Sequence, residues 1–450
     1  MAFQRPLQHG RLALPLLLVL LAAPGAHAQA GDTLTVEQCV NLARARSPEA
    51  RAAAAEQSAA SFDSSAAAHP RRPAYSLFGG ATIAPRHFYD PAITNLGEYS
   101  AKLGASWTWL DGGARARDAA RAGLGARSAA ASRAVSERDA GLAAGALALM
   151  NARLAEAEQA QSEAVAWLER LASEMTAGVR AGAHGQSDAL RVTLERDAAA
   201  SALRASQRDA KAAARDLARW IGRAPGAGVH VAPLRAGPLA AAADHAPAVD
   251  DSLRVLAAFA RSAEADLATL NEAAARVDLQ GAERKNAWQV ELAADAGIAG
   301  SDLTRLVPDD LRAQKENATL QDRLRHDLGA SASITFMAPL ADITQPLSVV
   351  ARRASLDAAL IRREQALAQQ QRDADELLSR WRAAALEHDA VRASLARAEE
   401  HLLRSRSLYA AGATTLLELL DARRLYDAAR GLEADARYEV LRSRLESEVR

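Results

Sequence analysis

A short motif occurs twice in the chain and interrupts two very long helical patterns at equivalent positions. In both copies, at 182–190 and 412–420, Gly-Ala is followed by four residues, an acidic residue, one further residue and leucine. The two motif glycines lie 230 positions apart (412 − 182), and Leu110 and Leu340 share this offset. Because two landmarks keep one spacing, the sequence predicts a duplicated unit.

The long helical patterns limit the shape of each unit. After Asp111-Gly112-Gly113, the first runs over about 114–177, which is roughly 96 Å of helix at about 1.5 Å per residue. Its apolar residues keep the three-four spacing of a coiled-coil seam. In the second unit, Pro346 opens a helix that continues to the turn at Gly412. Only 4% of the residues are aromatic and alanine is abundant, which favours long, closely packed helices.

Shorter helices follow the two motifs. One is predicted over about 186–220, and the other begins at Thr415, which forms a capping box with Glu418. Gly182 and Gly412 free the backbone to turn between antiparallel helices. The sequence therefore predicts two helical hairpins, each closed by a glycine turn.

Each unit also begins with a helix, predicted over about 35–69 and about 251–284. Thr35 supplies a capping box at the start of the first of these helices. Within them, Ser47-Pro48-Glu49-Ala50 matches Ser262-Ala263-Glu264-Ala265 at an offset of 215. The duplication therefore extends through the whole unit.

Two segments in each unit alternate between apolar and polar residues, which predicts β-strands with one apolar face. They lie at about 75–83 and 100–109 in the first unit, and at about 288–298 and 328–336 in the second. The polar faces carry Ser, Thr, Gly and Lys. The apolar residues predicted to face lipid are Leu103, Trp107, Leu292, Ile334 and Phe336.

The N-terminus has the pattern of a secretory signal peptide. Arg5 and Arg11 flank an apolar run at 12–23, and an Ala-x-Ala site predicts cleavage after Ala28. The apolar run is too short for a transmembrane helix. Cys39 is the only cysteine in the sequence, so no internal disulfide is expected, and we interpret it as a small buried side chain.

The expected organisation follows from these patterns. Residues 1–28 form the signal peptide, 29–221 the first unit and 251–450 the second unit. The segment 222–250, rich in Gly, Pro and Ala, links the two units.

The strands suggest a membrane-spanning assembly. Segments of about ten residues with one apolar face match the strands of an outer-membrane barrel. Four strands cannot close a barrel, and an open sheet edge is not tolerated in lipid. Three copies of the chain would supply 12 strands around a water-filled bore.

With these features, the chain resembles the TolC family of outer-membrane efflux proteins. The likeness rests on the repeat, on the Leu110-Asp111-Gly112-Gly113 turn after a strand, and on the Gly-Ala motif with its acid-x-Leu, and it covers essentially the whole mature chain. The sequence departs from the pattern at Ala341-Asp342-Ile343, which replaces Asp-Gly-Gly, and at Ala263, which matches Pro48.

The resemblance implies a mixed, mainly α fold built from a duplicated helix-strand-strand-long helix-helix unit. It implies a homotrimer whose 12-stranded outer-membrane β-barrel continues into a periplasmic α-helical coiled-coil tunnel. The location would be the outer membrane of a Gram-negative bacterium, with a large periplasmic part.

The function implied is a passive exit duct of a tripartite efflux or secretion system, docked at the helix tips by a periplasmic adaptor and an inner-membrane pump. Glu399 and Glu400 precede the second turn, where a solvated outer face is the favoured interpretation and an acidic ring in a trimer is the alternative. The residues expected at the docking tips are Gly182, Ala183, Asp188, Leu190, Gly412, Ala413, Thr415, Leu417, Glu418 and Leu420.

Other functional classes find little support in the sequence. Lys+Arg 55 balances Asp+Glu 55, so no basic surface for nucleic acid is expected. Phosphate-binding, serine-hydrolase and zinc-protease motifs are absent from the sequence, and its ten histidines show no metal-ligand spacing, so neither catalysis nor a cofactor is expected. The remaining alternative is a periplasmic coiled-coil adaptor or scaffold, which would not need four amphipathic strands.

Overall fold

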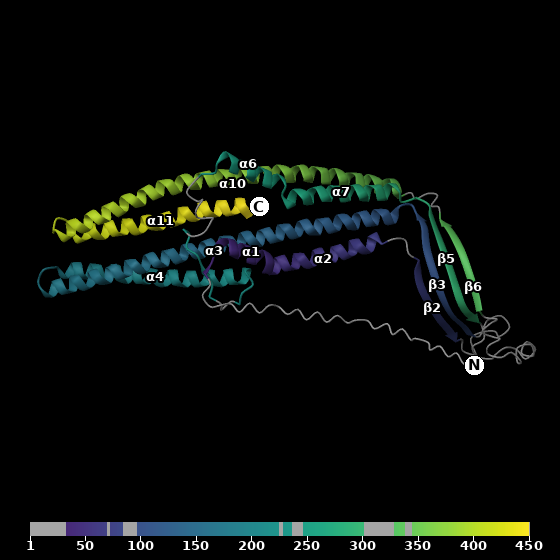
Figure 1. The fold of residues 1–450 in the computed structure, drawn as a ribbon, viewed down its shortest axis with the longest axis horizontal. Helices are drawn as coiled ribbons and strands as arrows, with labels where there is room; N and C mark the ends of the chain where they lie inside the picture. Colours follow the sequence, from purple (N-terminus) through teal and green to yellow (C-terminus); the bar gives the residue numbers. More distant parts are fainter. Residues whose placement is uncertain are drawn as a thin grey trace, which may run out of the picture.

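The computed structural model describes residues 33–69, 73–83, 97–224, 228–235, 246–300, 328–337 and 344–449. The molecule is elongated, with helices along most of its length and a β-sheet at one end (Figure 1). The expected signal peptide over 1–28 and the turn at 341–343 lie outside the described residues.

Each long helix lies beside two shorter helices that are placed end to end (Figure 1). α3 and α10 have 67 and 66 residues, so each is about 100 Å long. α3 also packs against α11, which joins the two units. The first long helix and its neighbours are α3 (Ala114–Arg180), α2 (Pro48–Ala68) and α4 (Gln186–Trp220), and the second set is α10 (Gln345–Ala410), α7 (Ala263–Glu283) and α11 (Leu416–Val449).

The helix predicted at the start of each unit is in fact two helices, so the single helices expected over 35–69 and 251–284 are wrong. α1 (Val36–Arg46) ends before Ser47, whose side chain accepts a hydrogen bond from Ala50 N at 3.1 Å and caps α2. Ser262 caps α7 in the same way after α6 (Val249–Ala260). A serine that caps the next helix stabilises a break in the chain, and the break falls on the motif repeated at offset 215.

Small side chains allow the helices to approach closely. Gly145 of α3 lies so near its neighbours that a Cβ there would be 2.5 Å from Leu445 Cδ2 and 3.0 Å from Val40 Cγ2. Ala148 is fully buried nearby. Cys39 of α1 is also fully buried, as expected, and burial raises the pKa of its thiol to about 11. The alanine-rich composition therefore forms thin cores between helices.

Four of the strands form one antiparallel sheet in the order β2-β3-β5-β6. The strict alternation predicted for this strand is wrong at its end, because a bulge lies between Thr108 and Leu110. Leu110, rather than Trp109, pairs with Val290. One extra residue in a bulge shifts the strand relative to its partner. The bounds are β2 (Ala74–Ile83), β3 (Gly97–Asp111), β5 (Gln289–Gly300) and β6 (Leu328–Met337).

A small second sheet lies halfway along the molecule, where β1 (Thr33–Leu34) pairs in parallel with β4 (His230–Val231). The segment after β4 is tied to the long helices by polar contacts. Leu234 N donates to Glu156 Oε1 at 2.9 Å, and Arg235 Nη2 lies 3.4 Å from Glu433 Oε2. This region holds the two units together at mid-length.

Glu433 of α11 is the buried centre of an ionic cluster. Its side chain is 4% exposed, and Arg437 Nη2 donates to its Oε1. His388 Nε2 of α10, which is 2% exposed, lies 3.5 Å from the same oxygen. We call Arg235, His388, Glu433 and Arg437 the mid-length cluster.

Candidate functional site

One face of the sheet is apolar and open. The register places Trp107, Leu292 and Ile334 directly opposite one another across three strands. Leu103 lies four residues before Trp107 on the same face, because successive side chains alternate. Exposure is 60% for Leu103, 75% for Ile334 and 56% for Phe336, so within one chain this face has little cover.

The other face is mainly polar, although it also carries Phe78, which pairs with Lys102. Lys102 Nζ lies 3.2 Å from Asp295 Oδ2, and Ser331 Oγ donates to Asp295 Oδ1. The register puts Ser106 and Ser333 on this side as well, both opposite Ala293. One face of the sheet is thus suited to contact with lipid and the other to contact with water.

The two Gly-Ala motifs form turns of the same geometry. Gly182 and Gly412 have φ of 73° and 72°, in the region that favours glycine. Ala183 N donates to Gly178 O at 2.8 Å, and Ala413 N donates to Leu408 O at 2.9 Å. No atom lies within 4 Å of a Cβ built on either motif glycine. The two turns close the helical hairpins at the end of the molecule away from the sheet (Figure 1).

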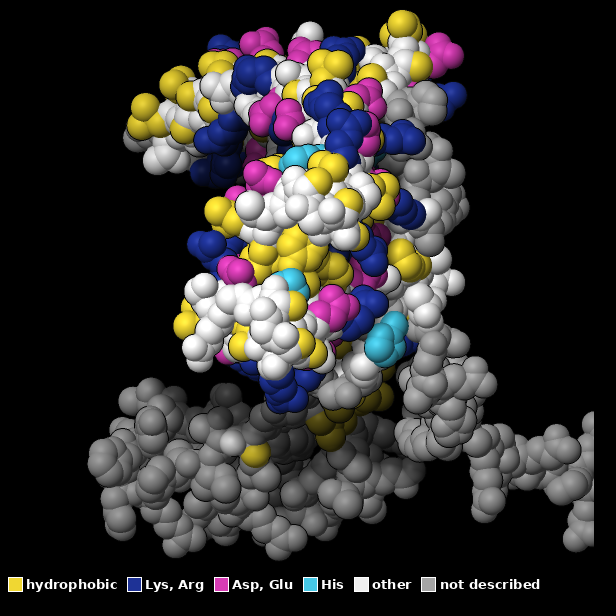
Figure 2. All heavy atoms as spheres, turned by 90° about the vertical axis from the view of Figure 1, so that its left-hand side faces the viewer, with side chains coloured by type: hydrophobic (Ala, Val, Ile, Leu, Met, Phe, Trp, Pro, Cys, Tyr) yellow, Lys and Arg dark blue, Asp and Glu magenta, His cyan; other side chains and the backbone are white. Residues whose placement is uncertain are grey.

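Most of the predicted tip residues are accessible. Gly182, Ala183, Gly412, Ala413, Thr415 and Glu418 are exposed, and Asp188 is half-buried. Thr415 Oγ1 accepts a hydrogen bond from Glu418 N at 3.3 Å, which caps the last helix. Viewed from the tip end, the two turns present mainly uncharged surface with apolar side chains between them (Figure 2).

Two leucines at matching positions of the motif have different environments. Leu190 is 61% exposed, whereas Leu420 is 3% exposed. Leu420 packs in a core with Leu168, Met175 and Val192 of the first hairpin. The expectation that Leu420 is available for docking is therefore wrong for this chain, because the second hairpin uses it to pack against the first. Leu417 is 44% exposed and stays accessible.

Tyr409 joins the tip of α10 to α3. Its hydroxyl donates to Met175 Sδ at 3.8 Å, and burial, followed by Asp188 and Glu174, raises the pKa of the phenol. The two hairpins are also held by ion pairs that the sequence analysis missed, such as Arg430 with Glu163 at 2.5 Å. Hydrogen bonding to Arg430 lowers the pKa of Glu163. No spacing signal could reveal this pair, because its partners are 267 residues apart.

Glu399 and Glu400 are both exposed. Arg404 Nη2 lies 3.0 Å from Glu400 Oε1, and both side chains of that pair are 70% exposed. Glu399 borders a cavity of about 930 Å³ between the hairpins, together with Glu163 and Arg430. The two glutamates therefore have different surroundings within one chain.

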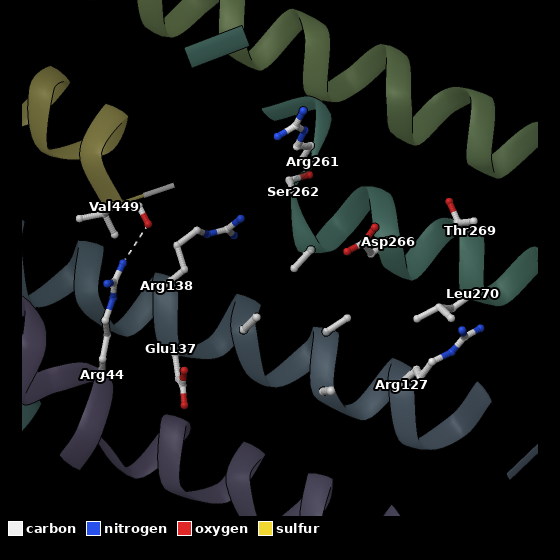
Figure 3. A pocket seen from close by; sticks show the side chains of 14 residues that line it. Arg44, Arg127, Glu137, Arg138, Arg261, Ser262, Asp266, Thr269, Leu270 and Val449 are labelled. Carbon is white, nitrogen blue, oxygen red and sulfur yellow. Dashed lines mark hydrogen bonds between the residues drawn. The ribbon is translucent and has the colours of Figure 1, made fainter. Parts of the chain in front are cut away.

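A second cavity, of about 820 Å³, lies where α1, α3, α7 and α11 meet (Figure 3). Alanines of α3 form part of its lining, and arginines from α1, α3 and the α6–α7 junction surround it. Arg44 Nη2 donates to Val449 O at 2.8 Å, which fixes the end of α11 (Figure 3). Arg138 pairs with Glu264 across the same region.

Within the described residues, none of the helices combines the length and the apolar character needed to cross a membrane. The same residues contain no group of three or more His, Cys, Asp and Glu side chains that could hold a metal ion.

No family model and no curated protein matches the chain. Solved structures do match it over nearly its whole length. The outer membrane protein VceC of Vibrio cholerae has a TM-score of 0.70 and 14% identity, over 91% of this chain and 94% of that one. The Campylobacter jejuni CmeC outer membrane channel has a TM-score of 0.70 and 12% identity, over 92% and 84%.

The Neisseria gonorrhoeae MtrE outer membrane channel, in its open state, has a TM-score of 0.69 and 17% identity, over 92% of this chain and 88% of that one. The mixed, mainly α fold expected from the sequence is confirmed by these likenesses. The chain has the fold of bacterial outer-membrane channels.

Proposed function

We propose that the chain is the outer-membrane exit channel of a tripartite efflux or secretion system in a Gram-negative bacterium. The observation that carries the proposal is the sheet, which has one apolar face, one polar face and two unpaired edges, and which continues into helices of about 100 Å. A periplasmic scaffold would have no use for an exposed apolar sheet face.

The sheet edges support a closed assembly of three chains. Among the residues that the structure describes, β2 and β6 each have a strand neighbour on one side only. Unpaired backbone groups are costly in lipid, so these edges need partners. Pairing β2 of one chain with β6 of the next in a trimer gives a 12-stranded barrel, with the Lys102 and Asp295 face toward the bore.

The two unlike leucines support the same assembly. Leu420 of the second hairpin is buried against the first hairpin of its own chain. Leu190, its counterpart in the first hairpin, is exposed. In a ring of alternating hairpins, Leu190 would pack against the second hairpin of the next chain. We therefore assign Leu190 to the contact between subunits rather than to the docking surface.

The assembly is tested by native mass measurement of the detergent-extracted protein and by conductance in planar bilayers. We expect a mass of three chains and discrete conductance steps. Leu190→Asp should shift the mass toward single chains, whereas Leu190→Met should keep the trimer. A wild-type protein that stays monomeric in water, without detergent, would favour the scaffold.

The facing of the sheet gives a graded prediction. Leu103→Arg, in the middle of β3, should lower the free energy of unfolding by about 2–4 kcal/mol, and Phe336→Arg, at the strand end, by about 1 kcal/mol or less. Ser333→Arg on the polar face is the control, because its side chain would reach water. Denaturant titration in lipid vesicles measures all three. Equal losses on the two faces would contradict the assignment.

The remaining assignments are parts of the same proposal. Export of the chain would use the signal peptide over 1–28, and the two units at 29–221 and 251–450 would be joined by 222–250. The turns at Gly182 and Gly412 would form the periplasmic mouth, docked by an adaptor and an inner-membrane pump. Three copies of Glu399 and Glu400 would line that mouth as an acidic ring. Transport through this conduit is passive and involves no catalysis.

A further inference from the structure

A basic cavity lies between α3, α7 and α10. The ends of these helices that border it are the ends nearest the sheet (Figure 1). Its volume is about 350 Å³, and it is bordered by the first turns of α3, the last turns of α7 and the first turns of α10. Its charged lining residues are Arg117, Arg121, Lys285 and Arg352, with Asp118 and Asp278. The cationic side chains outnumber the acidic ones.

One carboxylate orients two of the guanidinium groups. Asp278 lies 3.0 Å from Arg121 Nη1 and 3.5 Å from Arg352 Nη1. The arginine side chains remain 64% and 52% exposed, respectively. Because a guanidinium has five N–H donors, each arginine keeps donors for a further anion. A single Asp278 carboxylate also cannot neutralise two cations.

A third guanidinium is fixed from the other side. Arg117 Nη1 donates to Gly112 O at 2.8 Å, at the turn between β3 and α3. The N-terminus of α3 is occupied by Asp111, which accepts from Gly113 N and Arg115 N at 2.9 and 3.1 Å. An anion in the cavity would therefore be held by side chains rather than by the helix end.

Two aromatic side chains indicate where the cavity lies relative to the membrane–water interface. Trp288, just before β5, and Phe336, near the end of β6, contact each other edge to face with centroids 5.1 Å apart. They are 60% and 56% exposed. Exposed aromatic residues at strand ends gather at the membrane–water interface. Lys285 lies three residues before Trp288 on the helical side, which puts the cavity just outside that interface.

We propose that this cavity binds the phosphate group of an anionic phospholipid in the periplasmic leaflet of the outer membrane. The inference rests on the proposed function, because it requires the sheet to span that membrane. The planar guanidinium group of arginine matches the oxygens of a phosphate in geometry and charge. Basic pockets beside membrane-spanning segments bind lipid headgroups. The bound lipid would fix the depth at which the channel sits.

The test uses the full-length protein in detergent and compares added phosphatidylglycerol, phosphatidylcholine and inorganic phosphate by native mass spectrometry. We expect phosphatidylglycerol to be retained, and phosphatidylcholine, whose choline offsets the phosphate charge, to be retained less. Arg117→Gln with Lys285→Gln should weaken phosphatidylglycerol binding about 25- to 30-fold, since each cation near a headgroup contributes about fivefold. Arg352→Gln alone should weaken it about fivefold and leaves Asp278 paired with Arg121.

The matched control is Arg254→Gln with Arg261→Gln, which removes two exposed arginines near the α6–α7 junction, one helix length from the cavity.

Unchanged lipid retention in Arg117→Gln with Lys285→Gln and in Arg352→Gln, or an equal loss in the control, would overturn the proposal. Displacement of the lipid by millimolar phosphate would identify a soluble-anion site instead. Conductance of the wild-type protein is recorded in parallel: a conducting channel without selective lipid binding refutes only this inference, whereas a failure to enter bilayers refutes the channel itself.

Discussion

Replacing Glu433 by glutamine is expected to lower the free energy of unfolding by about 3–5 kcal/mol, the largest stability effect that we predict. The side chain is 4% exposed and pairs with Arg437, whose side chain is 12% exposed, so the substitution removes a buried negative charge from beside a buried cation. His388 Nε2 also loses its ionic neighbour at 3.5 Å. Denaturant titration in detergent, followed by far-ultraviolet circular dichroism, measures the loss.

The exposed pair of Glu400 and Arg404 provides a control with the same spacing on a helix. Both of its side chains are 70% exposed, so Glu400→Gln should change the free energy of unfolding by about 0.5 kcal/mol or less. Hydrogen exchange gives a second readout, since the segment 228–235 is tied to Glu433 through Arg235. Glu433→Gln should speed exchange there and around mid-length in α10 and α11. Equal stability of the two variants would show that the mid-length cluster does not hold the units together.

Local signals in the sequence predicted local structure well. The helix expected over 186–220 is α4 with the same bounds, and the capping box at Thr35 forms with Gln38. Capping and turn chemistry act over a few residues, so they can be inferred without knowledge of distant partners. The turns at Gly182 and Gly412 belong to this group as well, because only their own backbone requires the glycine.

Features that depend on neighbouring elements could not be inferred in this way. The bulge between Thr108 and Leu110 arises in the pairing of β3 with β5, and a period-two pattern does not mark it. The breaks at Ser47 and Ser262 differ from these cases, because a capping serine, followed in the first unit by Pro48 at the first helical position, is a local signal that the prediction of single helices overlooked. The burial of Leu420 depends on the other hairpin, whose Val192 and Met175 lie far away in the sequence.

The unequal environments of Leu190 and Leu420 explain how one motif can serve two contacts. A duplicated chain builds one hairpin-to-hairpin contact internally, through Leu420, and leaves the equivalent surface of Leu190 open. Identical closed rings are the usual way to satisfy such an open surface. In the proposed trimer, the exposed tip residues that neither contact uses, above all Leu417, would be left for a different partner.

Leu417→Asp is therefore expected to leave an inserted trimer but to abolish export. Leu417 is 44% exposed at the start of α11, one residue after the buried Leu416. Loss of a central apolar contact at an interface costs about 2 kcal/mol or more, which weakens adaptor docking at least about 30-fold. Export from cells and trimer yield from the same cells are measured together, with adaptor cross-linking from a cysteine at Ala413.

Three matched variants separate docking from folding. Leu417→Met keeps an apolar side chain and should retain export. Gly412→Val places a branched residue at φ 72°, where about 1–3 kcal/mol of backbone strain distorts the turn without a steric clash, so export should fall while the trimer persists. Gly182→Val should have the weaker effect, because the first motif lacks an apolar counterpart of Leu417 and has Ser187 there.

Export that survives in Leu417→Asp after the adaptor cross-link is lost would show that the tips do not dock the partner. Loss of the trimer itself in that variant would instead make Leu417 a structural residue, like Leu420.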